Sequence, residues 1–145
     1  MERINLVKKI IYDKLHPEMV KNNYGIYYGY AREPQENLYL IVSMLPFVDY
    51  DYVSPETIEQ EKVDFQIEVW SNTERETTSS SVLTDNVMNE VKRTLKLQDL
   101  AITDNSKTYK LVCLLPYITI PAKFHPGSQS WVAVIRFRAI FTQGE

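Results

Sequence analysis

The sequence predicts an α+β fold: a two-layer sandwich in which a mostly antiparallel sheet of four to five strands carries two helices packed on one face. Three observations predict it. Two segments alternate apolar and polar residues, two others repeat apolar residues at helical spacing, and the strands follow one another closely enough for hairpins. The chain of 145 residues has the length of one domain, which we expect to span residues 1–145.

The first predicted element is a helix over about residues 3–15. The apolar side chains of one helical face are Ile4, Val7, Ile11 and Leu15. Pro17 is expected to end this helix, because the residue before a proline is pushed out of the α region. Residues 17–35 have the composition of an irregular segment.

The next two predicted strands lie on either side of residues 46–61, whose conformation the sequence does not decide. "NLYLIVSML" (37–45) reads as an interior strand that Pro46 terminates, and residues 46–61 read as a long loop or an extended hairpin arm. In "EKVDFQIEVWSNTERE" (61–76) the alternation predicts a strand with one buried face. Its apolar residues are Val63, Phe65, Ile67 and Val69.

A second helix is predicted over about residues 73–96. Thr73 and Glu76 have the spacing of a capping box, and Asn72 or Ser71 could serve as the cap instead. The apolar stripe of this helix is Leu83, Val87, Val91 and Leu95.

Three further strands are predicted after the second helix. "LQDLAI" (97–102) and "TYKLVCLLPYI" (108–118) are separated by "TDNS", a hairpin-type turn, and Pro116 and Pro121 are expected to close the second strand. Residues 121–130 read as a second long loop. The final strand, "WVAVIRFRAIFT" (131–142), again alternates.

Composition narrows the class of protein. The chain is 44% hydrophobic, with a net charge of -3 that argues against specific nucleic-acid binding. No stretch approaches the roughly 18 apolar residues of a membrane span, and the N-terminus has no signal-peptide pattern. A lone cysteine, Cys113, suits a reducing compartment. We therefore expect a soluble intracellular protein that contacts no membrane.

The residues that carry chemistry are sparse and scattered. Two histidines and one cysteine make a weak set of metal ligands, and Cys113 has no neighbouring cation in the sequence to activate it. The sequence has no phosphate-binding, nucleophile-elbow or zinc-protease motif. We therefore expect no metal, no cofactor and no enzymatic activity.

The stretch "VDFQIEVWSNTERETTSSSVLTDNVMNEVKRTL" (63–95) resembles the tail terminator, or tail completion, proteins of long-tailed bacteriophages. In that family a strand of the form V-x-x-Q-x-x-x-W-S is followed directly by a long helix, and a final strand closes the domain after a loop. The residues that fit the strand are Val63, Gln66, Trp70 and Ser71. The resemblance covers residues 61–142 more closely than residues 1–60.

This resemblance implies a structural protein of the virion tail, assembled in the host cytoplasm. Several copies, typically six, would form a ring on the finished tail tube, stop its polymerisation and present a surface to the head connector. The implied partners are other copies of the chain, the tail tube protein and the head connector protein, and DNA would pass through the ring without specific binding.

The proline-bearing loops 46–60 and 117–130 are the candidate subunit or tube contacts, because aromatic anchors within a polar rim are typical of interfaces. The candidate residues are Phe47, Asp49, Tyr50, Asp51, Tyr52, Val53 and Phe124. The alternative is that these loops fold back on their own domain.

Two other functions stay open at this point. One is another head–tail connector or stopper protein of the same virion, which would share size and composition. The other is a small cytoplasmic ligand-binding or enzymatic α+β domain, which would need a pocket lined by convergent polar groups.

Overall fold

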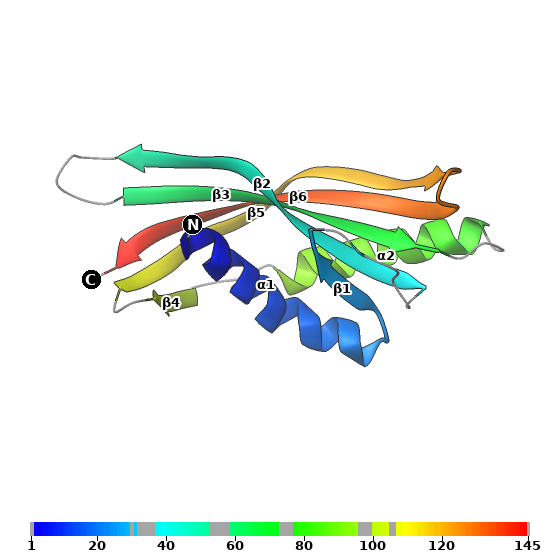
Figure 1. The fold of residues 1–145 in the computed structure, drawn as a ribbon, viewed down its shortest axis with the longest axis horizontal. Helices are drawn as coiled ribbons and strands as arrows, with labels where there is room; N and C mark the ends of the chain where they lie inside the picture. Colours follow the sequence, from blue (N-terminus) through cyan, green and yellow to red (C-terminus); the bar gives the residue numbers. More distant parts are fainter. Residues whose placement is uncertain are drawn as a thin grey trace.

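The computed structural model of the chain describes residues 2–29, 31, 37–52, 59–72, 77–95, 100–104 and 107–144. Its elements, in chain order, are α1 (Glu2–Lys21), β1 (Gly25–Tyr28), β2 (Leu38–Tyr52), β3 (Glu59–Ser71), α2 (Thr77–Thr94), β4 (Leu100–Asp104), β5 (Lys107–His125) and β6 (Ser130–Gly144). The six strands form one sheet in the order β1-β2-β3-β6-β5-β4 (Figure 1). All neighbouring strands are antiparallel except β1 and β2.

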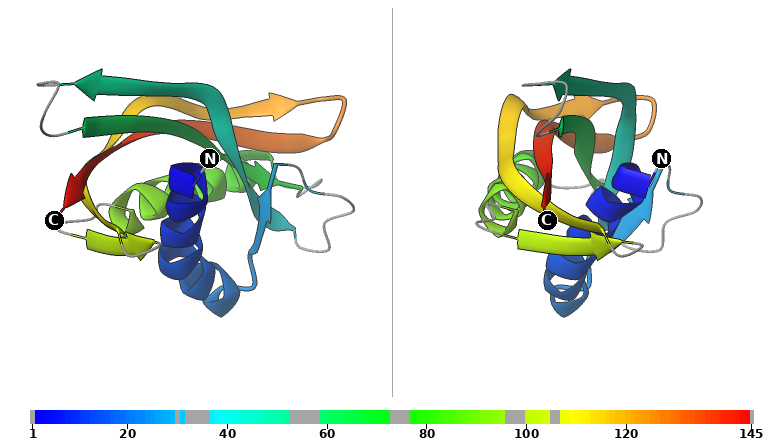
Figure 2. Two further views of the ribbon diagram at one scale, coloured as in Figure 1. Left: turned by 60° about the vertical axis from the view of Figure 1, so that its left-hand side comes forward. Right: turned by 90° about the vertical axis from the view of Figure 1, so that its left-hand side faces the viewer.

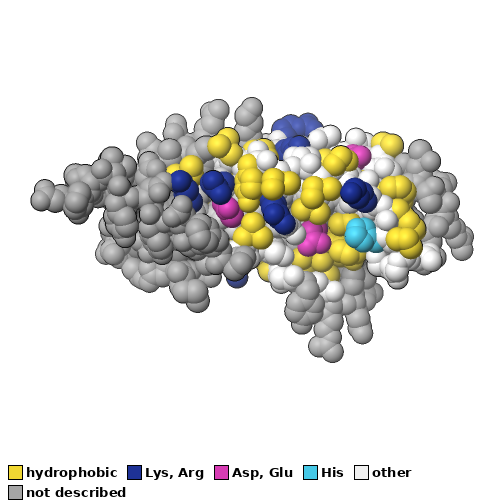
Figure 3. Space-filling view, turned by 90° about the horizontal axis from the view of Figure 1, so that it is seen from above, with side chains coloured by type: hydrophobic (Ala, Val, Ile, Leu, Met, Phe, Trp, Pro, Cys, Tyr) yellow, Lys and Arg dark blue, Asp and Glu magenta, His cyan; other side chains and the backbone are white. Residues whose placement is uncertain are grey.

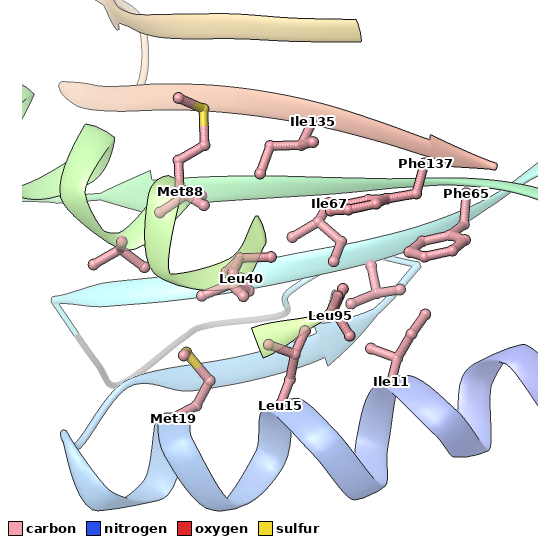
Figure 4. Packing of buried hydrophobic residues seen from close by; sticks show 14 of the residues in the cluster. Ile11, Leu15, Met19, Leu40, Phe65, Ile67, Met88, Leu95, Ile135 and Phe137 are labelled. Atoms are coloured by element: carbon pink, nitrogen blue, oxygen red, sulfur yellow. The ribbon is translucent and has the colours of Figure 1, made fainter. Parts of the chain in front are cut away.

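The predicted α+β sandwich is confirmed. Figure 2 shows both helices on the same, concave side of the sheet, with β5 curving toward β4. The alternating strands bury the expected faces: Val63, Phe65, Ile67 and Val69 of β3, and Ala133, Ile135, Phe137 and Ala139 of β6. These residues share one cluster with Val7, Ile11 and Leu15 of α1 and with Val87, Val91 and Leu95 of α2, so the core lies between sheet and helices (Figure 4). Leu83, the fourth residue of the predicted α2 stripe, is 37% exposed and is not part of this cluster.

The two segments with alternating apolar and polar residues are neighbours at the centre of the sheet. β3 pairs with β6 from Gln60↔Thr142 to Ser71↔Trp131. At the middle of this pair the rings of Phe65 and Phe137 stack with centroids 5.1 Å apart. The inner face of this central pair is therefore the surface on which the helices pack.

The first helix runs past Pro17 to Lys21, so the predicted end at Pro17 is wrong. Proline in a helix interior costs about 3 kcal/mol. One further turn buries Met19, which is 1% exposed, and full burial of such a side chain stabilises by about 1.5–3 kcal/mol. The helix ends instead before Asn23, whose φ of 59° is the left-handed conformation of a helix C-cap.

The three prolines that were expected to end strands lie inside them. Pro46 falls in a register irregularity of β2 between Met44 and Val48, and β5 runs through both Pro116 and Pro121 to His125. Two irregularities of β5 begin at or span these prolines. A proline lacks the N–H that a ladder needs, and bulges or one-sided strands tolerate that loss. The second predicted loop, 121–130, is consequently strand up to His125 and a turn beyond it.

The segment 17–35 contains a strand that the sequence did not predict. β1 pairs in parallel with β2, from Gly25↔Tyr39 to Tyr28↔Val42, which raises the sheet to six strands. The predicted hairpin between residues 97 and 118 is present as the β4–β5 pair. The capping box at residues 73–76 lies outside the described residues.

Tyr28 of β1 offers a test of packing between β1 and α1. Among the described residues its buried hydroxyl has no hydrogen-bond partner. Burial, followed by the nearby charges of Tyr12 and Asp13, raises the pKa of Tyr28 to about 12 from its ordinary 10.0. The unfolded chain therefore ionises first, so this hydroxyl lowers the free energy of unfolding progressively as the pH rises from 10 toward 12.

We expect Tyr28→Phe to leave the free energy of unfolding unchanged at neutral pH or to raise it by up to about 1 kcal/mol. The variant should also lose less stability than the parent at alkaline pH. Urea unfolding at pH 8 and pH 11 measures both effects. A loss of more than about 1 kcal/mol at pH 8 would show that the hydroxyl makes a stabilising contact.

Candidate interaction surface

The sheet has a second face, opposite the helices, which we call the outer face. It is formed by the side chains of β3 and β6 that alternate with the core residues. The residues of β2 and β5 that pair with them belong to the same face. Figure 3 views the molecule from this side and shows Lys and Arg side chains set among hydrophobic ones. Because the helices cover the other face, the outer face is the broad surface that this fold presents.

An ion pair links the two central strands on the outer face. Arg138 donates from Nε to Oδ1 of Asp64 at 2.8 Å and from Nη2 to Oδ2 at 3.0 Å. Asp64 is only 8% exposed, whereas the side chain of Arg138 is 43% exposed. This bidentate geometry is the strong form of such a pair.

Tyr117 of β5 extends this group. Its hydroxyl donates to Oδ2 of Asp64 at 3.3 Å, and the guanidinium carbon of Arg138 lies 5.2 Å from its ring centroid. Partial burial, and then the negative charge of Asp64, raise the pKa of Tyr117, so the hydroxyl stays a donor at neutral pH. Side chains from β3, β6 and β5 are thereby held in one arrangement.

A second group of contacts follows β3. Arg136 donates from Nε to Oε1 of Gln66 at 2.9 Å, and Gln66 donates from Nε2 to Glu68 at 3.2 Å. Trp70 donates from its indole nitrogen to the other oxygen of Glu68 at 3.0 Å and stacks on Tyr39, with ring centroids 6.2 Å apart. Gln66 and Trp70 of the family-like motif therefore help to order the outer face.

β5 contributes exposed apolar side chains beside these polar groups. They are Leu115, Tyr117, Ile118 and Ile120, each between 36% and 52% exposed. Among the described residues β4 pairs with β5 only as far as Leu111, so beyond Leu111 the described part of the chain leaves this side of β5 as a sheet edge. Its backbone is poorly suited to strand addition, because Pro116 and Pro121 have no N–H and the N–H of Ala122 donates to Asp85 of α2 at 2.9 Å. A partner would thus meet side chains here rather than an open ladder.

The described outer face carries an excess of positive charge. Its cations are Lys62, Lys123, Arg136 and Arg138, and its anions are Asp64 and Glu68. The whole chain has a net charge of -3, so the charge is distributed unevenly over the molecule. Apolar side chains combined with arginine and tyrosine are typical of protein interfaces.

The structure separates the candidate contact residues into two places. Five of them lie on β2. Phe47 falls in the register irregularity between Met44 and Val48, and Asp49, Tyr50, Asp51 and Tyr52 lie where β2 pairs with β3 from Val48↔Val63 to Tyr52↔Glu59. Of the two readings left open for residues 46–61, this backbone is an extended hairpin. Val53 lies outside the described residues.

Phe124 lies at the opposite end of the sheet, on β5 rather than in a loop, with its ring 5.4 Å from that of Trp131. The six described candidates therefore do not converge on one site. The outer-face residues of β5 and β6 were missed as candidates. Prolines within a β-rich apolar segment, as at residues 108–121, are the available sequence signal of an edge strand.

Within the described ranges there is no group of three or more His, Cys, Asp or Glu side chains that could hold a metal ion. One cavity lies between α1 and the sheet, with about 10 Å³ of space lined by Val7, Ile10, Ile11, Phe65, Leu114 and Ala139. That volume is at the lower limit of what one water molecule needs, and the lining has no polar side chain. No helix among the described residues is long and apolar enough to cross a membrane.

The fold has counterparts among solved structures. A chain from the virion of a native gene transfer agent particle is 20% identical, with a TM-score of 0.62 over 92% of each chain. A second solved structure, which carries no functional description, is 12% identical with a TM-score of 0.64, covering 97% of this chain and 96% of that one. No protein-family model and no curated protein matches the chain. At these identities the likeness shows the shared fold.

Proposed function

We propose that this chain is a non-enzymatic structural protein of a bacteriophage tail, which forms a ring at the end of the tail tube. The ring would stop polymerisation of the tube and present the surface to which the head attaches. The single observation that carries the proposal is the fold shared over 92% of both chains with a component of a gene transfer agent virion.

The sequence motif supports the same role from a separate direction. Its central strand, with Gln66 and Trp70, leads toward α2 as the tail terminator family pattern requires. In the structure these two residues brace the outer face through Glu68 instead of lining a reactive site. A rigid sheet with a braced, exposed surface suits a building block of an assembly.

The geometry also offers two separate contact regions, as a ring subunit needs. The β2–β3 hairpin lies at one end of the sheet, and β5 runs toward the other end (Figure 1). The exposed side chains Leu115, Ile118 and Ile120 belong to that part of β5. A head-to-tail ring requires two different patches on each subunit, since one patch alone gives only a symmetric pair.

The proposal is tested by deleting the gene from the phage genome that encodes the chain. We expect headless tails of uncontrolled length in electron micrographs of the lysate, because nothing would stop tube growth. Supplying the protein from a plasmid should restore tails of uniform length and infectious particles. Normal infectious particles without the gene would refute the role.

Electron micrographs of a phage that carries the labelled protein separate the proposal from a head–tail connector or stopper role. A terminator labelled with gold is expected at the end of tails that lack heads. A connector or stopper would instead label the portal vertex of heads that lack tails, and that result would replace the terminator assignment.

A further inference from the structure

We propose that the β2–β3 hairpin of one copy docks on the outer face of β5 and β6 in the next copy. This inference rests on the proposed ring and assigns its two contact surfaces. We call residues 47–52 and 59–61 the hairpin arm, and the outer-face side chains Leu115, Ile118, Ile120, Lys123 and Arg136 the docking face.

The hairpin arm is acidic and rich in apolar residues. Residues 47–52 and 59–61 contain no Lys or Arg, and their carboxylates are Asp49, Asp51, Glu59 and Glu61. The aromatic residues Phe47, Tyr50 and Tyr52 alternate or neighbour with these acids. β1 pairs with β2 only between Tyr39 and Val42, so β1 leaves the arm uncovered.

The docking face has the complementary chemistry. Lys123 is exposed, and Arg136 bonds to the uncharged amide of Gln66. Leu115 is 52% exposed and Ile120 37% exposed, beside these cations. An acidic, aromatic arm on a basic, aliphatic face combines charge complementarity with apolar burial, which are the two ingredients of a specific interface.

The hairpin arm cannot contact the docking face of its own copy. In one copy β3 pairs with β2 on one side and with β6 on the other, so the arm continues the same sheet layer. Reaching the outer face of that sheet would require both strands to leave their ladders. A second copy is therefore the occupant, and a contact between two different patches closes into a ring when the rotation allows it.

The test uses charge reversal on each side of the contact in the purified chain. The arm variant is Asp49→Lys/Asp51→Lys, and the face variant is Lys123→Glu/Arg136→Glu. Lys8→Glu/Lys9→Glu is the matched control, because both lysines are exposed on α1 and the change in charge equals that of the face variant. Circular dichroism shows whether each variant is folded, and sedimentation velocity measures self-association.

We expect the parent and the control to associate, with an association constant that falls as salt rises. Each reversed variant alone should associate at least about 100-fold more weakly, because like charges meet across the contact. An equal mixture of the two variants should associate again. In the mixture reversed arms meet reversed faces and native arms meet native faces, so the two variants alternate around a ring with an even number of copies.

Several results would overturn the docking. They are a parent that stays monomeric at its highest soluble concentration, reversed variants that associate like the parent, or a mixture that fails to recover. Face variants that form normal rings but fail to attach to tubes or heads would assign the face to another virion protein. The gene-deletion phenotype is independent of all these measurements, so either proposal can fail while the other stands.

Discussion

Phe137→Asp is expected to unfold the domain. Phe137 is 1% exposed, and its ring stacks on Phe65 at the centre of the β3–β6 pair. The substitution removes that packing and places a carboxylate in an apolar core, which costs several kcal/mol against a total stability of about 5–15 kcal/mol. Loss of the cooperative thermal transition, followed by circular dichroism, is the measurement.

Phe124→Asp is the matched control, because it makes the same chemical change at a ring that is 40% exposed. We expect it to keep a cooperative transition with a modestly lower melting temperature. A Phe137→Asp protein that melts like the parent would mean that β6 turns its other face toward the helices.

Arg138→Met is expected to lower the free energy of unfolding by about 2 kcal/mol. It leaves the mostly buried carboxylate of Asp64 without its bidentate partner, with only Tyr117 still donating among the contacts described above. The expected loss is smaller than for a fully buried pair, because the side chain of Arg138 is 43% exposed and solvent already weakens the attraction. Urea unfolding at neutral pH measures the loss.

The double variant Asp64→Leu/Arg138→Met tests the reason for that loss. If an orphaned carboxylate is the cause, removing both charges should recover most of the stability, because an apolar pair of similar size needs no partner. The two single losses would then exceed the loss in the double variant by at least about 1 kcal/mol. Simple additivity of the single effects would mean that the pair contributes no coupling.

The elements that could be predicted from sequence are those whose burial is periodic within a single segment. The alternation around Phe65 and Phe137 identifies both central strands, and the apolar spacing through Val87 and Val91 identifies α2. Each of these patterns reflects one face packed on the core. No neighbouring segment is needed to interpret it.

The predicted ends of the helix and strands at prolines were wrong because the effect of a proline depends on its tertiary context. Pro17 is accepted where continuing the helix buries Met19, and Pro46 is accepted where β2 is already irregular. β1 escaped prediction for a similar reason, since four residues without alternation become a strand only through pairing with β2. The secondary structure at these positions therefore depends on residues that are distant in the sequence.

The candidate surface could be predicted only in part. The prolines and aromatic residues of segment 46–60 predicted a contact region, which stays a prediction, and the structure gives an extended backbone at residues 47–52 and 59–61. The docking face could not be read in the same way, because Lys123 and Arg136 share a surface only once β5 pairs with β6. The contact between Tyr117 and Asp64 likewise joins residues 53 positions apart.

The arrangement of the sheet has a consequence for how the chain acquires its structure. β2–β3 and β5–β6 each join strands that are close in sequence, whereas Asp64 and Arg138, which face each other across the central seam, are 74 positions apart. Closing so large a loop is slow compared with forming a local turn. We therefore expect the two half-sheets to form separately and to pair last, which would leave the edge of β3 that faces β6 exposed to incorrect pairing during synthesis.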